Sequence, residues 1–286
     1  MLLHSALPDF AMRLPALLSS ALVFGASASL AQGPAGASAP PLWEVGAFGL
    51  GVSQQAYPGS DQHIQRGLVL PYFVYRGEFL RTDRETLGLR ALRSPRYEFD
   101  IGFAGSFGSN ADDISARRGM ADLGTLVEFG PRLKLNLGQA AGGRWRLELP
   151  LRGVFDLSDG FANRGLSFEP ELQYQRRSPL GFAYGTSVGA VFANQRLAGT
   201  FYTVQPSEAT ATRAAYTAKS GLIAWRAGVS ISKDITPDWR LFGFARFDSV
   251  AGAANEGSPL VRRTSGASAG LGLSWTWMRS QARAAD

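Results

Sequence analysis

The sequence predicts an all-β protein that forms a closed antiparallel transmembrane β-barrel of about twelve strands, with ten as the alternative count. Apolar and polar residues alternate over residues 122–157, which is the pattern of strands with one apolar face. The only long apolar run lies at the N-terminus, so no later segment supplies the roughly 20 apolar residues of a spanning helix. All 6 tryptophans lie at or near the ends of expected strands, where barrels carry aromatic girdles.

The alternation at 122–157 is the clearest pattern in the chain. Odd positions from Leu123 to Leu137 are mostly apolar, whereas even positions are mostly polar. The break at 138–143 is rich in glycine, and alternation resumes over 144–157. Two such runs joined by a turn of small residues predict a hairpin, with strands at 122–137 and 144–157. Alternating segments of about ten residues are typical of transmembrane barrels, which have lipid outside and a polar lumen inside.

The other expected strands follow in order from residue 43. The first two, 43–53 and 67–76, flank a loop at 54–65 whose Tyr-Pro-Gly-Ser-Asp composition favours a turn. Charged residues weaken the alternation at 79–92, and it is clear again at 97–107. Beyond the hairpin, strands are expected at 166–174, 182–192, 197–204, 221–232, 239–249 and 267–277.

The strand count decides on which side of the membrane each loop lies. The two weakest strands are 79–92 and 197–204, and bacterial single-chain barrels have even strand numbers. Keeping both gives twelve strands and puts the polar loop at 108–121 on the periplasmic side. Leaving both out gives ten strands and puts that loop outside the cell.

The N-terminal residues are typical of a secretory signal. Arg13 precedes an apolar, Ala- and Ser-rich run that ends in a small-residue pattern, so residues 1–31 are expected to be removed before Gln32. Met12 is a better start than Met1, because residues 1–11 contain no basic n-region and Arg13 follows Met12 directly. Residues 32–41 form an expected flexible lead-in, 42–277 the barrel, and 278–286 a C-terminal tail.

The composition argues against several classes of function. The absence of cysteine excludes disulfides and thiolate metal sites, and His63 is the only histidine after the signal, so we expect no catalytic set, no metal site and no cofactor. Asp112 and Asp113 lack the spacing of an EF-hand calcium loop. The net charge of +6 is spread along the chain without a basic helix or an aromatic-basic motif, which disfavours nucleic acid. Such a charge suits anionic lipid headgroups or anionic partners.

Charged residues on the polar face of the hairpin are expected to face the lumen. They are Glu128, Arg132, Lys134, Arg146, Glu148 and Arg152. Mixed signs on neighbouring strands can pair and fill a narrow barrel, which is one reading. The other reading is a charged constriction in a pore for small solutes.

The loop before the hairpin is the best candidate for contact with a partner protein. It contains Arg117, Arg118, Gly119 and Met120, followed by Asp122. Two arginines beside a flexible apolar side chain suit an acidic or mixed surface. The alternative is that the arginines brace the rim of the barrel.

Several stretches together resemble the MipA/OmpV family. They are Tyr57-Pro58-Gly59-Ser60-Asp61, Leu70-Pro71-Tyr72 with Tyr75-Arg76-Gly77, residues 117–123, Glu128-Phe129-Gly130-Pro131, residues 258–261 and residues 270–275. The resemblance covers residues 43–277. Tyr57, Pro58, Gly59 and Asp61 are expected to form a structural turn.

The resemblance implies a barrel in the outer membrane of a Gram-negative bacterium, in contact with its lipids and without enzymatic activity. The family's namesake is a scaffold that links a murein lytic transglycosylase to a murein synthase. Other members are porin-like or adhesive surface proteins. We therefore expect a scaffold for cell-wall remodelling, with a small-solute channel or a surface adhesin or receptor as alternatives. The oligomeric state is left open.

Overall fold

The computed structural model describes residues 40–76, 80–83, 86–89 and 92–283. The expected signal peptide, most of the expected lead-in, Gly77 and the last three residues of the expected tail lie outside these ranges. Within them, strands dominate and one α-helix occurs, α1 (Gln195–Tyr202). Short 3₁₀ turns lie at Ala111–Asp113, Ser115–Arg117 and Pro206–Glu208. No helix in the described part of the chain has the length and apolar character needed to cross a membrane.

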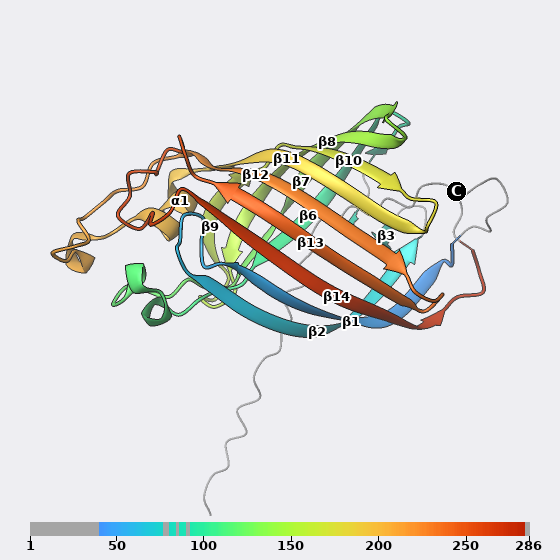
Figure 1. Cartoon of the computed structure of the whole chain (residues 1–286), viewed down its shortest axis with the longest axis horizontal. Helices are drawn as coiled ribbons and strands as arrows, with labels where there is room; N and C mark the ends of the chain where they lie inside the picture. Colours follow the sequence, from blue (N-terminus) through green and yellow to red (C-terminus); the bar gives the residue numbers. More distant parts are fainter. Residues whose placement is uncertain (1–39, 77–79, 84–85, 90–91, 284–286) are drawn as a thin grey trace, which may run out of the picture.

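The strands form one antiparallel sheet in which neighbours in space are mostly neighbours in sequence (Figure 1). Their bounds are β1 (Trp43–Gln55), β2 (His63–Arg76), β3 (Leu80–Asp83), β4 (Thr86–Leu89), β5 (Leu92–Arg93), β6 (Tyr97–Ser106), β7 (Leu126–Ala140), β8 (Gly143–Asp156), β9 (Ala162–Phe168), β10 (Glu171–Arg177), β11 (Phe182–Ala193), β12 (Gly221–Asp234), β13 (Trp239–Ser249) and β14 (Ser265–Arg279).

The sheet closes on itself. The first strand pairs with the last, with Phe48 opposite Ser274, and on the far side β4 lies against β6. Strands β9 and β10 lie end to end between β8 and β11, and both β4 and β5 lie beside β6. The 14 described strands therefore occupy twelve positions around the barrel, because two pairs share a position. The predicted closed antiparallel barrel is confirmed.

Two of the expected strands are wrong in detail. Residues 197–204 are not a strand, because helix α1 covers most of them. The amide oxygen of Asn194 caps this helix by accepting a hydrogen bond from the backbone nitrogen of Leu197, and Leu197, Ala198 and Tyr202 are buried on one face. The expected strand at 79–92 is instead the β3–β4 hairpin followed by β5.

These two errors cancel in the strand count but not in the position of the loops. The extra strand at 80–89 precedes the loop at 107–125, so that loop lies at the end of the barrel opposite the described chain ends. The expectation that twelve strands put this loop on the periplasmic side assumed that it shares an end with the chain termini, and the described strands place it at the other end. The reason is that the β3–β4 hairpin adds one reversal of the chain, which inverts the strands from β6 to β11 relative to the expected direction. The missing strand at 197–204 restores the expected direction from β12 onward.

The two ends of the barrel differ sharply (Figure 1). One end, which we call the loop end, carries helix α1 and the long connections 56–62, 107–125, 194–220 and 250–264. The other, the turn end, carries the described chain termini and the short connections 94–96, 141–142, 178–181 and 235–238.

The outer face of the barrel is apolar. Val69 is 77% exposed and Leu271 is 63% exposed, whereas Arg132 inside is 7% exposed. This inverts the usual arrangement of a soluble protein and is the arrangement that lipid requires. Aromatic rings gather near both ends, since Trp239 stacks on Trp275 at 5.3 Å at the turn end and the rings of Phe129 and Phe155 stack at 4.9 Å at the loop end. These are the interfacial girdles of a membrane barrel.

Candidate functional site: an ionised chamber beneath a loop cap

The long loops at the loop end pack into one body, which we call the loop cap (residues 56–62, 107–125, 194–220 and 250–264). Its core consists of side chains drawn from all four segments. They include Tyr57, Ile114, Leu197, Tyr202, Val204 and Leu260, all buried. Because apolar burial is the main stabilising contribution available to loops, this shared core makes the cap an ordered structure.

The Tyr57–Asp61 turn anchors the loop cap. The hydroxyl of Tyr57 donates to the carbonyl oxygen of Leu260 at 2.8 Å, and the hydroxyl of Tyr202 donates to the carbonyl oxygen of Pro58 at 2.9 Å. Gly59 has a φ of +92°, and its carbonyl accepts backbone hydrogen bonds from residues 262 and 263. Two of the stretches that carry the family resemblance, 57–61 and 258–261, therefore meet in space.

The remaining residues of the resemblance lie partly in the cap and partly in the barrel. Asp61 has one carboxylate oxygen that is buried without a hydrogen-bond partner among the described residues. At the turn end, Tyr75 stacks with Phe73, and Arg76 forms a buried ion pair with Glu44 at 3.0 Å. The sheet leaves no space for a side chain at Gly130, since a Cβ there would meet the backbone of Leu151. Pro131, on the same strand, is exposed.

The candidate partner loop is split between buried and exposed residues. Arg117 is 4% exposed, and its guanidinium donates to the carbonyl oxygens of Phe201 at 3.3 Å and Ala121 at 3.1 Å. It also lies over the ring of Tyr57 at 5.8 Å. Arg118, Gly119 and Asp122 are exposed and Met120 is half-buried. Arg117 therefore braces the cap, and only its neighbours offer a free surface.

Burial in the cap changes the acidity of its tyrosines and of Arg117. Removal from water raises the pKa of Tyr57 to about 12, the nearby Arg117 cation opposing the shift only in part. Burial also raises the pKa of Tyr202 and lowers that of Arg117. Both tyrosines are thus held as neutral hydrogen-bond donors.

A first charge network lies on the lumen wall formed by the neighbouring strands β6, β7 and β8. Arg132 binds Asp100 with two hydrogen bonds, from Nε to Oδ1 at 2.9 Å and from Nη2 to Oδ2 at 2.8 Å. Lys134 contacts the same carboxylate at 2.9 Å, and Glu148 bridges Arg132 at 3.5 Å and Arg146 at 3.7 Å. Paired groups that span neighbouring strands hold the register and fill the lumen.

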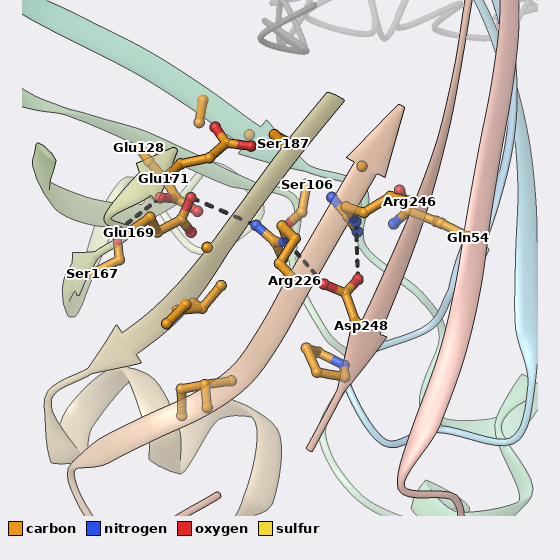
Figure 2. Close-up of a pocket in the computed structure, with 18 of the residues that line it drawn as sticks. Gln54, Ser106, Glu128, Ser167, Glu169, Glu171, Ser187, Arg226, Arg246 and Asp248 are labelled. Atoms are coloured by element: carbon orange, nitrogen blue, oxygen red, sulfur yellow. Dashed lines mark hydrogen bonds and ion pairs between the residues drawn. The ribbon is translucent and has the colours of Figure 1, made fainter. Parts of the chain in front are cut away.

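A second network lies nearer the loop cap, around a chamber (Figure 2). Arg152 pairs with Glu169 at 3.1 Å and with Glu128 at 3.7 Å. Arg226 links Glu169 at 3.6 Å to Asp248 at 2.8 Å, and Arg246 contacts Asp248 at 2.9 Å. The chamber has a volume of about 300 Å³ and is bounded toward the cap by Tyr57 and Leu197, among others.

The structure brings all six predicted lumen residues into these two networks. The predicted lumen residues did not include Asp100, Glu169, Arg226, Arg246 and Asp248. The alternation of apolar and polar residues could have predicted that such residues face the lumen, because Arg226 stands on the polar face of an expected strand whose other face is apolar. The alternation could not have predicted their ion-pair partners, since those depend on which strands are neighbours and in which register.

Most of the chain matches one known family. Residues 45–277 match the family described as MltA-interacting protein MipA. No curated protein matches the chain. Among solved structures, a bacterial polysaccharide outer membrane secretin is 7% identical, with a TM-score of 0.43, over 84% of this chain and 100% of that one. A Pseudomonas aeruginosa FadL homologue is 8% identical, with a TM-score of 0.34, over 83% of this chain and 90% of that one.

Proposed function

The chain belongs to the MipA family of MltA-interacting proteins, and from this premise we propose that it is a non-enzymatic scaffold in a Gram-negative outer membrane. In this role it holds a murein lytic transglycosylase beside a murein synthase during cell-wall remodelling. The observation that carries the proposal is the family match over residues 45–277, because the family's description names an interaction and not a reaction.

The lumen supports a structural role for the barrel wall. Its carboxylates and guanidinium groups are largely engaged with one another across neighbouring strands. Such networks fix the strand register and stiffen the barrel. A stiff barrel is a suitable platform for partners that bind at its rim.

We assign the partner surface to the turn end. In outer-membrane barrels the short turns face the periplasm and the long loops face outward. Murein and its enzymes lie on the periplasmic side, so the exposed residues Arg118, Gly119 and Asp122 of the loop cap point away from them in this orientation.

The turn end offers a basic surface for an acidic partner. Arg96, Arg176 and Arg177 are exposed there, and within the described ranges none of the three has a carboxylate partner. The β7–β8 hairpin lies between these positions in the sheet, and its tip from Leu137 to Gly142 is exposed. An unpaired arginine can bind a carboxylate with two hydrogen bonds, which gives such a surface both attraction and orientation.

A binding titration tests the scaffold. The folded chain in detergent is titrated with a murein lytic transglycosylase from the same cell, beside a double variant Arg176→Ala and Arg177→Ala and a control Arg118→Ala. We expect saturable binding that the double variant weakens about tenfold or more and the control leaves unchanged. Weakening by Arg118→Ala alone would reverse the assigned orientation, and no binding at any accessible concentration would remove the scaffold.

The chamber favours a small-solute channel as the second candidate. Its volume of about 300 Å³ fits a small solute, and Arg132 and Glu148 of the first network line it. A solute in the lumen would therefore meet these charges. Planar-bilayer recording distinguishes the two functions: steady conductance that changes on Arg132→Ala would favour the channel, and a silent wild-type protein would exclude it.

A further inference from the structure

The chamber beneath the loop cap contains two side chains of opposite charge whose hydrogen-bonding groups are only partly occupied by other described residues. Five carboxylates (Glu128, Glu148, Glu169, Glu171 and Asp248) and four guanidinium groups (Arg132, Arg152, Arg226 and Arg246) line it. Most of them are joined by the ion pairs already described. Arg246 and Glu171 are the two whose hydrogen-bonding groups remain in part available.

Arg246 presents donors to the chamber. Its Nε donates to Oδ2 of Asp248 at 2.9 Å, but no described residue accepts from its two terminal nitrogens. Figure 2 shows Gln54 beside Arg246, and the strand register agrees, because Arg246 is opposite Ser268 of β14 and Ser53 is opposite Ala269. The side-chain amide of Gln54 is bonded to no described residue although Gln54 is 8% exposed. A guanidinium edge next to a free amide is the arrangement that holds a carboxylate.

Glu171 presents an acceptor to the same chamber. Its Oε2 accepts a hydrogen bond from Nε2 of Gln173 at 2.9 Å, and it forms no ion pair with a described arginine or lysine. A carboxylate in a confined lumen without a cationic partner attracts an ammonium or guanidinium group.

The two groups line the same chamber from different strands, Glu171 from β10 and Arg246 from β13. A chain of ion pairs leads from Glu169 through Arg226 and Asp248 to Arg246, and Figure 2 shows Glu171 on the Glu169 side of Arg226. A simple anion at Arg246 would meet the excess of carboxylates around it, and a simple cation at Glu171 would meet the nearby arginines. A molecule carrying both charges satisfies both positions.

We propose that the chamber is a binding site for a small zwitterion, with the ligand's carboxylate at Arg246 and Gln54 and its ammonium group at Glu171. The ligand class is that of amino acids and short peptides. This site is independent of the proposed scaffold function, which uses the turn end of the barrel, so either can fail without the other.

Calorimetric titration of the folded chain in detergent tests the site with matched probes. Three ω-amino acids of increasing length are glycine, 4-aminobutyrate and 6-aminohexanoate. Succinate and 1,4-diaminobutane match 4-aminobutyrate in carbon number while carrying only one sign of charge. We expect at least one of the amino acids to bind, with a Kd about tenfold or more below those of the diacid and the diamine. Equal or tighter binding of either single-sign probe, or no binding of any amino acid, would overturn the proposal.

Two neutral variants separate a binding role from a structural one. Glu171→Gln should weaken the amino acid about tenfold or more and turn the preference toward the diacid. Arg246→Gln should weaken it similarly and turn the preference toward the diamine. Both variants should fold. Arg246→Gln leaves the ion pair between Asp248 and Arg226 at 2.8 Å, and Glu171 forms no ion pair with a described residue. Heat-modifiable mobility on gels checks that the barrel is folded. A uniform loss for all probes, or the same loss with the control Arg118→Gln on the exposed cap, would count against the site.

Discussion

The hydroxyl of Tyr57 and the carbonyl oxygen of Leu260 form a 2.8 Å hydrogen bond between residues 203 positions apart in the chain. Both residues are buried, at 2% and 0% exposure. The bond ties the first long loop of the barrel to the last, which lie side by side because β1 and β14 are neighbours. It is therefore a direct consequence of barrel closure.

Removing this hydrogen bond should loosen the loop cap without unfolding the barrel. Tyr57→Phe deletes only the hydroxyl and leaves the Leu260 carbonyl buried without its donor, which costs about 1–3 kcal/mol. We expect faster proteolysis within 250–264 and unchanged heat-modifiable mobility on gels. Tyr184→Phe is the matched control, because the hydroxyl of Tyr184 makes no hydrogen bond with a described residue. Equal protease sensitivity of the two variants would contradict the anchoring role.

The loop cap should lose stability at high pH. The pKa of Tyr57 is about 12 in the folded cap and 10.0 in a model peptide, so between these values only the unfolded loop releases the phenolic proton. The contribution is fully present below pH 10 and falls as pH rises, by at most about 3 kcal/mol. Proteolysis of 250–264 should accelerate over this interval, and Tyr57→Phe should reduce the acceleration. A rate that is independent of pH from 10 to 12 would contradict the buried neutral phenol.

The Asp100–Arg132 pair should be critical for barrel stability. Asp100→Asn leaves the buried Arg132 guanidinium short of its main counter-charge, which costs about 3–5 kcal/mol when a buried pair is broken. We expect the temperature at which the folded gel band is lost to fall clearly. Asp234→Asn serves as the control, since its pair with Arg240 is half exposed and is expected to contribute about 1 kcal/mol or less. Similar shifts in the two variants would show that burial does not set the difference.

Adjacent arginines in the candidate partner loop should behave differently. Arg117→Ala removes the donors to Phe201 and Ala121 and should make the cap protease-sensitive. Arg118→Ala changes an exposed side chain and should leave the digestion pattern unchanged. If the two variants are digested at the same rate, Arg117 does not brace the cap.

The sequence by itself determined the fold class, the family resemblance and the faces of most strands. Alternation in 122–157 placed Leu133 outward and Arg132 inward, because the period of two is a local property of an extended chain. The same rule, applied to the strand that contains Arg226, could have predicted that this residue faces the lumen and lines the chamber. Local spacing could also have identified helix α1, since Asn194 is a capping residue followed by apolar residues at helical intervals.

The tertiary structure alone decided which charges meet and at which end each loop lies. Arg226 and Asp248 become partners only because β12 pairs with β13 in one register, and a shift of one residue between these strands would put the two side chains on opposite faces of the sheet. The loop at 107–125 reaches the end opposite the chain termini because the short β3–β4 hairpin adds one reversal. Both outcomes depend on pairings between distant segments, which a one-dimensional pattern of polar and apolar residues does not contain.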